Sequence, residues 1–322
     1  MSIYLDRYYK AACEDNSIVT KALNKIASGR VLITGANGVV GYALARLLDS
    51  HANVDLSLAV RDRDFVGVDF FSPKSKVVDY ENIFDGQYDY IFHCATHSQP
   101  AMFLDDWQGT VRLSTDTLLR LLEVTTKQLV FTSSTEIYSG ATKDSEESDG
   151  GSTTSEHPRA IYIESKRLAE AACIHSGLGS ISRIALAAGP FAKPSDTRVL
   201  YELIRKGRKL NKISLLGGHD SIRQYQYTGA CALRMLVSGL LGEKSLYNNA
   251  GPYVLTLGDL ARFLADYLDA EYVNSNASKN GDIGAPKAVK ISMDRFNNEF
   301  PEMALIDPAF DDFIKWVIED TQ

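Results

Sequence analysis

The sequence predicts an α/β protein built on a doubly wound parallel sheet, with a smaller lobe of mixed structure in its C-terminal part. Three observations lead to this fold class. Short apolar runs alternate with helix-like stretches through the first half of the chain, as in sheets with helices on both faces. The first apolar run leads directly into a glycine-rich turn at 35–41. Beyond residue 188, glycine and proline pairs divide the chain into shorter elements.

The N-terminal elements follow from the spacing of apolar residues. Residues 1–28 place apolar side chains among charges, which predicts one or two short amphipathic helices that form a packing arm. The run 31–34 is short enough for a strand buried on both faces, and 39–48 has a helical pattern. Further buried strands are expected at 56–60, 76–78 and 90–95.

The middle of the chain continues this alternation. Apolar positions within 109–123 predict a helix, and the run 128–132 after it predicts a strand. Residues 139–156 are polar and rich in glycine, so we expect an exposed loop there. A helix is then expected at 161–174 and a strand at 182–187.

Composition and charge exclude several classes of protein. The 322 residues are 45% apolar and 23% charged, as in an ordinary globular protein. Lysine and arginine total 34 against 41 aspartates and glutamates, and the net charge of -7 argues against nucleic-acid binding. The four cysteines are widely spaced and lack a histidine at a metal-ligand interval, so we expect reduced thiols and no metal site. Without an apolar leader or a run of roughly 18 apolar residues, we expect no membrane span and a cytoplasmic location.

The glycine-rich turn predicts a dinucleotide site. Gly35, Gly38 and Gly41 form a GxxGxxG pattern after the first strand and at the start of the first helix. Backbone amides at such a turn can approach a pyrophosphate, which side chains would block. This is the arrangement of a Rossmann-like domain. We assign the cofactor to the three glycines and to Asn37, Val39 and Ala95 near them.

The end of the second strand leaves the cofactor's phosphate preference open. Arg61 there favours the 2'-phosphate of NADP, whereas Asp62 favours the ribose 2'-hydroxyl of NAD. Both charges are present, so we expect NAD or NADP without choosing between them.

A tyrosine and a lysine predict proton transfer. Tyr162 and Lys166 are four residues apart, so both side chains project from one face of a helix. The lysine cation stabilises a phenolate, which lets the tyrosine exchange a proton with a substrate hydroxyl, and it can also hold the nicotinamide ribose. The run Thr132-Ser133-Ser134, at the end of the preceding strand, supplies a hydroxyl where the substrate oxygen would lie.

These three features in this order resemble the extended short-chain dehydrogenases/reductases, the NAD-dependent epimerase/dehydratase family that acts on nucleotide sugars. The resemblance covers nearly the whole chain after residue 28, and 158–167 is similar to the catalytic helix of sugar-nucleotide 4,6-dehydratases and UDP-glucuronate decarboxylases. It implies oxidation of the sugar at C4 by a tightly bound cofactor, and a homodimer. Ser134 would be the hydroxyl donor, Tyr162 the acid/base and Lys166 its partner.

We therefore divide the chain into three parts. Residues 1–28 form the N-terminal helical arm, and 29–188 form the dinucleotide-binding domain. Residues 189–322 mainly form the substrate-binding lobe, with some segments returning to the Rossmann-like domain.

The residues after Ser134 bear on the outcome of C4 oxidation. Ser134-Thr135-Glu136 resembles the strand end of dehydratases and decarboxylases, where Glu136 could move a proton beside C5. Dehydratases place aspartate where this chain has Thr135, which puts water loss in doubt and slightly favours decarboxylation. A 4-epimerase needs neither group, so all three outcomes stay open.

Two arginines resemble substrate-lobe motifs of the family. Arg198 and Arg223 could hold the diphosphate of a nucleotide sugar through charge-assisted hydrogen bonds, and Arg223 is the stronger candidate. Two other functions stay open. One is a ketone or aldehyde reductase that releases NADP after each turnover, and the other is a non-catalytic scaffold or sensor that keeps the fold.

Overall fold

A seven-stranded sheet forms the centre of the molecule in the computed structural model, which describes residues 2–61, 71–215, 217–274 and 290–321. Every neighbouring pair in this sheet is parallel, in the order β10-β6-β5-β4-β1-β2-β3. Its strands are β1 (Arg30–Thr34), β2 (Asp55–Val60), β3 (Lys76–Asp79), β4 (Tyr88–His93), β5 (Thr125–Ser134), β6 (Gly179–Ile184) and β10 (Leu246–Asn249).

The strand order creates a crevice beside β1. The chain proceeds from β1 outward to β2 and β3, then crosses back to place β4 on the other side of β1. Ligands of open α/β sheets bind outside the carboxyl ends of the strands at such a reversal. The predicted doubly wound parallel sheet is confirmed, and the reversal lies at the glycine-rich turn.

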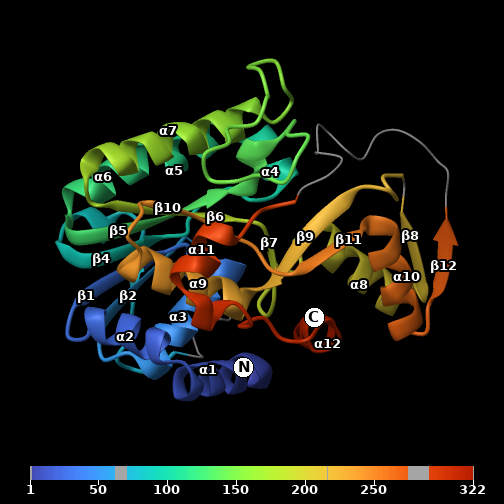
Figure 1. Ribbon diagram of the computed structural model, residues 1–322, viewed down its shortest axis with the longest axis horizontal. Helices are drawn as coiled ribbons and strands as arrows, with labels where there is room; N and C mark the ends of the chain where they lie inside the picture. The colour runs from blue at the N-terminus through green and yellow to red at the C-terminus, as the bar shows by residue number, and fades with distance from the viewer. Residues whose placement is uncertain (1, 62–70, 216, 275–289, 322) are drawn as a thin grey trace.

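Helices cover both faces of this sheet (Figure 1). One face carries α5 (Trp107–Ser114), α6 (Asp116–Glu123) and α7 (Ala160–Ser176), while α3 (Val39–His51) and α9 (Thr228–Leu241) cover the other. The shorter elements nearby are α4 (Pro100–Asp105), α11 (Asp294–Glu299) and the 3-10 turns η2 (Asn82–Phe84), η3 (Thr135–Tyr138) and η4 (Pro301–Met303). Among the described residues, no helix is both long enough and apolar enough to cross a membrane.

Our expectation of a single helix over 109–123 was wrong in one respect, because the structure has two helices there. The chain breaks between α5 and α6 at Thr115, which has φ -113° and ψ -68°. The Thr115 hydroxyl donates to the carbonyl of Val111 at 2.8 Å. A threonine that bonds back in this way competes with the helix backbone and bends the helix, and apolar spacing does not report that competition.

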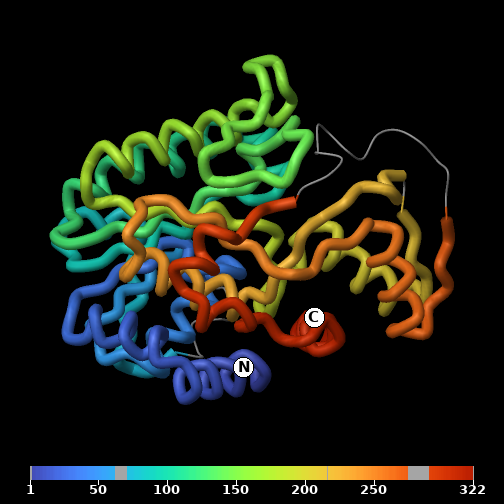
Figure 2. The backbone as a smooth tube through the Cα atoms, in the orientation of Figure 1, coloured from blue at the N-terminus to red at the C-terminus, as the bar shows by residue number. Residues whose placement is uncertain are grey.

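The N-terminal arm consists of α1 (Ile3–Asp15) and α2 (Ser17–Ile26), as the apolar spacing predicts. It packs beneath α3 and α9, and Figure 2 shows it beside the C-terminal helix α12 (Phe310–Asp320). The Tyr9 hydroxyl donates to the carbonyl of Ala43 in α3, and the Ser2 hydroxyl donates to Asp320 in α12. The arm therefore packs on the helices that cover one face of the large sheet, and it also contacts the C-terminal helix α12.

A second lobe extends from one end of the large sheet (Figure 1). It contains the three-stranded sheet β11-β9-β7 and the two-stranded sheet β12-β8. Its elements are β7 (Leu186–Ala188), α8 (Val199–Leu210), β8 (Lys212–Leu215), β9 (Ile222–Tyr227), β11 (Tyr253–Thr256), α10 (Leu257–Tyr267) and β12 (Glu271–Asn274). Between β9 and β11 the chain returns to the large sheet through α9 and the edge strand β10.

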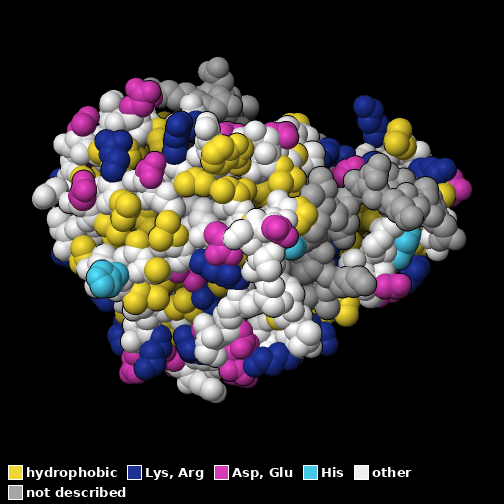
Figure 3. Space-filling model, turned by 90° about the horizontal axis from the view of Figure 1, so that it is seen from above, with side chains coloured by type: hydrophobic (Ala, Val, Ile, Leu, Met, Phe, Trp, Pro, Cys, Tyr) yellow, Lys and Arg dark blue, Asp and Glu magenta, His cyan; other side chains and the backbone are white. Residues whose placement is uncertain are grey.

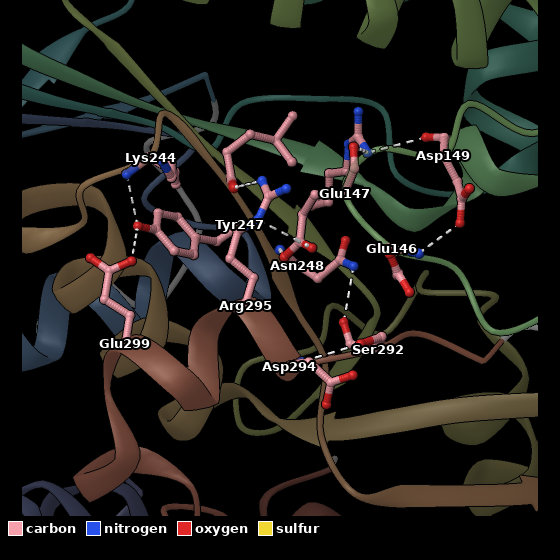
Figure 4. Close-up of polar contacts among 12 residues, drawn as sticks. Glu146, Glu147, Asp149, Lys244, Tyr247, Asn248, Ser292, Asp294, Arg295 and Glu299 are labelled. Carbon is pink, nitrogen blue, oxygen red and sulfur yellow. Dashed lines mark hydrogen bonds and ion pairs between the residues drawn. The ribbon is translucent and has the colours of Figure 1, made fainter.

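The segment 139–156 is less exposed than its polar sequence suggests, so our expectation of an exposed loop was wrong in part. Glu147 is buried, and its carboxylate accepts from the backbone N–H of Asn248 in β10 at 2.9 Å. The same carboxylate pairs with Arg295 of α11 at 3.6 Å. Figure 4 shows these residues converging along β10. The polar side chains satisfy an edge strand that would otherwise lack partners.

Replacing Glu147 should destabilise the fold. Glu147→Ala leaves a buried N–H of β10 and a guanidinium without their partner, which costs about 2 to 4 kcal/mol of unfolding free energy. Urea denaturation measures this loss. Glu146→Ala is the matched control, since Glu146 is exposed. Equal stability of the two variants would show that the contact with β10 contributes nothing.

Candidate active site

The glycine-rich turn after β1 borders a groove at the crevice of the large sheet. Of the residues that the sequence assigns to the cofactor, six line this groove: Gly35, Asn37, Gly38, Val39, Arg61 and Ala95. The structure thus brings together residues from the ends of β1, β2 and β4. A groove at this place suits a dinucleotide, whose pyrophosphate would lie at the N-terminus of α3.

Each glycine of the turn meets a different requirement. Gly35 has φ +67°, and a Cβ there would lie 2.8 Å from the backbone of Ala95. A Cβ at Gly41 would lie 2.2 Å from the carbonyl oxygen of Gly35, so this glycine lets α3 pack onto the turn and does not line the groove. Gly38 is exposed at the start of α3, where a side chain would project toward an incoming pyrophosphate.

The choice between NAD and NADP stays open. Arg61 is exposed and lines the groove together with Tyr80. Asp62, the competing acidic residue, lies outside the described residues.

The opposite wall of the groove comes from the segment after β7. Phe191, Lys193, Asp196 and Arg198 line it. Two nitrogens of the Arg198 guanidinium donate to the Asp196 carboxylate, Nε to Oδ1 at 3.0 Å and Nη2 to Oδ2 at 2.6 Å. Sequence analysis assigned Arg198 to the substrate and missed Phe191 and Lys193. Their only sequence signal is the turn Gly189-Pro190 just before them.

Tyr162 and Lys166 lie on one buried face of α7, as their spacing predicts. Burial raises the pKa of Tyr162, whereas a hydrogen bond with Ser134 and the charges of Arg159 and Arg198 oppose that rise. Lys166 donates from Nζ to the carbonyl of Thr132 at 2.9 Å. Its ammonium lies 5.8 Å from the centre of the Tyr162 ring. The structure therefore brings the predicted serine, tyrosine and lysine together.

The environment of Lys166 lowers the pKa of its ammonium into the physiological pH range. Burial lowers the pKa of Lys166 to about 7, against the opposing influence of the Glu170 carboxylate one turn along α7. Cys94, which lines the groove, lies close enough to Lys166 that the ammonium partly offsets the rise of the thiol's pKa to about 12. Lys166 thus lies near the groove residue Cys94, although Lys166, Tyr162 and Ser134 do not themselves line the groove.

Glu136 lies in η3, directly after Ser134. The Ser134 hydroxyl accepts from the Glu136 N–H at 3.1 Å and caps the turn. Oε1 of Glu136 pairs with Arg159, and Oε2 is buried without a hydrogen-bond partner among the described residues. Burial raises the pKa of Glu136, while Arg159 and Arg223 oppose the rise. This carboxylate has one oxygen fixed and one available.

The remaining candidates for substrate contact lie near Glu136. Arg223, on β9, donates to the carbonyl of Ile222 at 3.0 Å and acts electrostatically on Glu136. Thr135 is buried in η3. The second lobe thus brings Arg223 near Glu136 in η3, and its expected contact with a diphosphate stays a prediction.

Two further residues near Tyr162, Phe103 and Arg159, were also missed by sequence analysis. The Phe103 ring stacks on Tyr162, with centroids 4.7 Å apart and an angle of 16° between the planes. Arg159 lies three residues before Tyr162, so its neighbourhood to the tyrosine-lysine pair was a usable signal. Phe103 lies in the short helix α4, about 60 residues away, and no spacing pattern indicated it.

Comparison with known proteins agrees with this geometry. Residues 31–237 match the model of the NAD dependent epimerase/dehydratase family. The chain belongs to this family. Its NAD dependence agrees with the groove, and the resemblance to extended short-chain dehydrogenases is confirmed. A search of curated proteins finds no significant match. No group of three or more metal-ligating side chains occurs in the described part of the chain.

Three solved structures, among them an epimerase and a dehydratase, share the fold. The epimerase Mth375 of Methanothermobacter thermautotrophicus is 17% identical, with a TM-score of 0.80 and 95% of each chain covered. TunA, an NAD-dependent NDP-hexosamine 5,6-dehydratase, is 18% identical, with a TM-score of 0.74 and coverage of 91% of this chain and 97% of that one. MoeE5, in complex with UDP-glucose and NAD, is 17% identical, with a TM-score of 0.73 and coverage of 91% and 98%.

Gly38→Val should abolish NAD binding without unfolding the chain. The branched side chain would project from the start of α3 into the space that the pyrophosphate needs. Calorimetric titration with NAD measures the loss. Gly150→Val is the control, since a Cβ at Gly150 meets nothing within 4 Å. Tight binding by the Gly38 variant would contradict the placement of the cofactor.

Lys166→Met should stabilise the cofactor-free protein more at pH 6 than at pH 9. Folding lowers the pKa of Lys166 from 10.5 to about 7, so between these values the unfolded chain binds more protons. Stability of the natural protein therefore rises with pH across this range, and the cost of the buried charge is greatest below pH 7.

Denaturation at both pH values measures the difference. Lys21→Met, at an exposed position of α2, should show no such trend. A gain for Lys166→Met that is constant or grows with pH would show that the buried lysine does not lose its proton in this range.

Proposed function

We propose that this chain oxidises the sugar of a nucleotide sugar at C4, with hydride passing to a nicotinamide dinucleotide held in the groove. The observation that carries the proposal is the meeting of Ser134, Tyr162 and Lys166, with Lys166 close to the groove residue Cys94. Family membership and the glycine-rich turn support the cofactor's place. Bound there, the nicotinamide would supply the hydride acceptor.

The chain's own residues would handle the proton. The Lys166 ammonium stabilises Tyr162 as a phenolate, and this phenolate takes the proton of the sugar hydroxyl to become a neutral phenol. The Ser134 hydroxyl, which opposes the rise in the pKa of Tyr162, would orient the sugar oxygen. Because burial raises the pKa of Tyr162, the positive charges around it are needed for this step near neutral pH.

Glu136 supports further chemistry at C5 or C6 over simple epimerisation at C4. A C4 ketone acidifies the hydrogen at C5, and the unpartnered Oε2 of Glu136 is a suitable base. Thr135 lacks the acidity that expels a hydroxyl, so decarboxylation is favoured slightly over dehydration. Arg223 is the proposed contact for the diphosphate, because Arg198 is already paired with Asp196.

A homodimer through the helices above the sheet is part of this proposal. Apolar side chains gather on the face that Figure 3 views. Three of them, Leu119 on α6 and Leu168 and Ile174 on α7, are more than half exposed. Exposed apolar groups on neighbouring helices mark contact surfaces. A cytoplasmic location stays a prediction.

A panel of UDP-, dTDP-, GDP- and CDP-sugars, with mass spectrometry of the products, tests the proposal. Loss of carbon dioxide, loss of water or an unchanged mass with altered chromatography separates the three outcomes. Stoichiometric release of oxidised or reduced cofactor would instead indicate a simple reductase. Absence of any product from all of them would contradict the proposal and leave a non-catalytic role.

Tyr162→Phe should lower turnover by roughly a hundredfold or more, because only the transferable proton is lost. Binding of NAD should change little, since the ring that stacks on Phe103 is retained. Turnover is measured on the substrate found in the panel, and calorimetry measures NAD binding. Near-normal turnover would remove Tyr162 from the mechanism.

A further inference from the structure

Arg159 occupies a buried position between the two proton-transfer groups. It precedes α7 directly and is 6% exposed. Its guanidinium pairs with Oε1 of Glu136, and its charge also opposes the rise in the pKa of Tyr162. One side chain therefore acts on both candidate acid/base residues.

Phe103 forms a common platform for Arg159 and Tyr162. The guanidinium carbon of Arg159 lies 5.9 Å from the centre of the Phe103 ring, on which Tyr162 also stacks. Contact of a guanidinium with an aromatic ring is attractive and restricts the arginine's rotamers. The position of Arg159 is thus set by α4 as well as by α7.

The pairing leaves Glu136 half satisfied. A buried carboxylate with a single partner is costly, because its second oxygen loses water without replacement. Oε2 has no hydrogen-bond partner among the described residues. An unsatisfied oxygen of this kind, fixed in direction by the pairing of Oε1, is suited to take up a substrate proton.

We propose that Arg159 is a positioning residue that holds the Glu136 carboxylate with Oε1 paired and Oε2 placed to exchange a proton at C5. This inference rests on the proposed function. In decarboxylation the C5–C6 bond breaks with loss of carbon dioxide, the electron pair moves toward the C4 ketone oxygen as an enolate, and protonated Oε2 then delivers a proton to C5. In dehydration the C5–H bond breaks instead, the proton passes to Oε2, and the electron pair forms the same kind of enolate before the C6 hydroxyl leaves as water. Neither oxidant nor reductant is consumed.

Other charges face Glu136 and would remain without Arg159. Arg223 approaches from β9, and His157 from the segment before α7. Tyr162 faces it from α7. Since Arg159 is the largest of the influences that oppose burial, its removal should make the carboxylate harder to ionise.

Infrared difference spectroscopy tests the contact without any turnover. The carboxyl band of Glu136 is identified by its absence in Glu136→Gln and followed through a pH titration. In Arg159→Gln its titration midpoint should rise by about one pH unit or more, and Arg159→Lys should restore most of the shift. Arg262→Gln, which removes a surface pair with Asp259, should leave the midpoint unchanged. An unchanged midpoint in Arg159→Gln would overturn the proposal.

Rapid-mixing kinetics then separate positioning from folding. With the substrate identified in the panel, Arg159→Gln should slow the formation of reduced cofactor by no more than about tenfold, because Ser134 and Arg198 still act on Tyr162, but should slow product formation roughly a hundredfold. Combining it with Glu136→Gln should add little further loss, because both act on one group.

Different results would contradict the positioning role of Arg159 and the proposed function. Equal losses in cofactor reduction and product formation would overturn a positioning role for Arg159. If the natural protein reduces no cofactor with any sugar nucleotide, the proposed function fails. The infrared titration still decides whether Arg159 holds Glu136.

Discussion

A buried ion pair between Arg183 of β6 and Glu170 of α7 fixes the catalytic helix on the sheet. Nε and Nη2 of Arg183 donate to the two oxygens of Glu170 at 2.9 and 2.7 Å. Glu170 also accepts from Ser133, the neighbour of Ser134. Nη1 of Arg183 donates to the hydroxyl of Tyr138, the last residue of η3. Desolvating two charges costs several kcal/mol, and these additional hydrogen bonds offset it.

The chemistry of the site depends on the same pair. Glu170 follows Lys166 by one turn of α7, and its charge opposes the effect of burial on the lysine. Lys166 therefore keeps its proton to about pH 7 and can stabilise a phenolate at Tyr162. By holding the end of β5, η3 and α7 together, one ion pair sets the distances among Ser134, Glu136, Tyr162 and Lys166.

Sequence analysis brings residues of the site together where they are close in sequence, because local helix and turn geometry then places them. The turn at 35–41 and the pair Tyr162 and Lys166 each lie within two helical turns, so local geometry determines them. Arg183 lies 45 residues from Tyr138, and Phe103 lies far from Tyr162, so only tertiary packing brings them together. The burial of Glu147 within 139–156 was missed for the same reason, because its partner Asn248 in β10 is about a hundred residues away.

Transfer of a deuterium label from C4 tests the central claim most directly. A nucleotide sugar that the enzyme converts is prepared with deuterium at C4 and mixed with a stoichiometric amount of protein carrying NAD. The reaction is quenched within one turnover, and the extracted cofactor is analysed by mass spectrometry. Our account predicts deuterium on the reduced nicotinamide. Reduced nicotinamide without deuterium, or product that appears with no labelled reduced nicotinamide at any earlier time point, would contradict oxidation at C4.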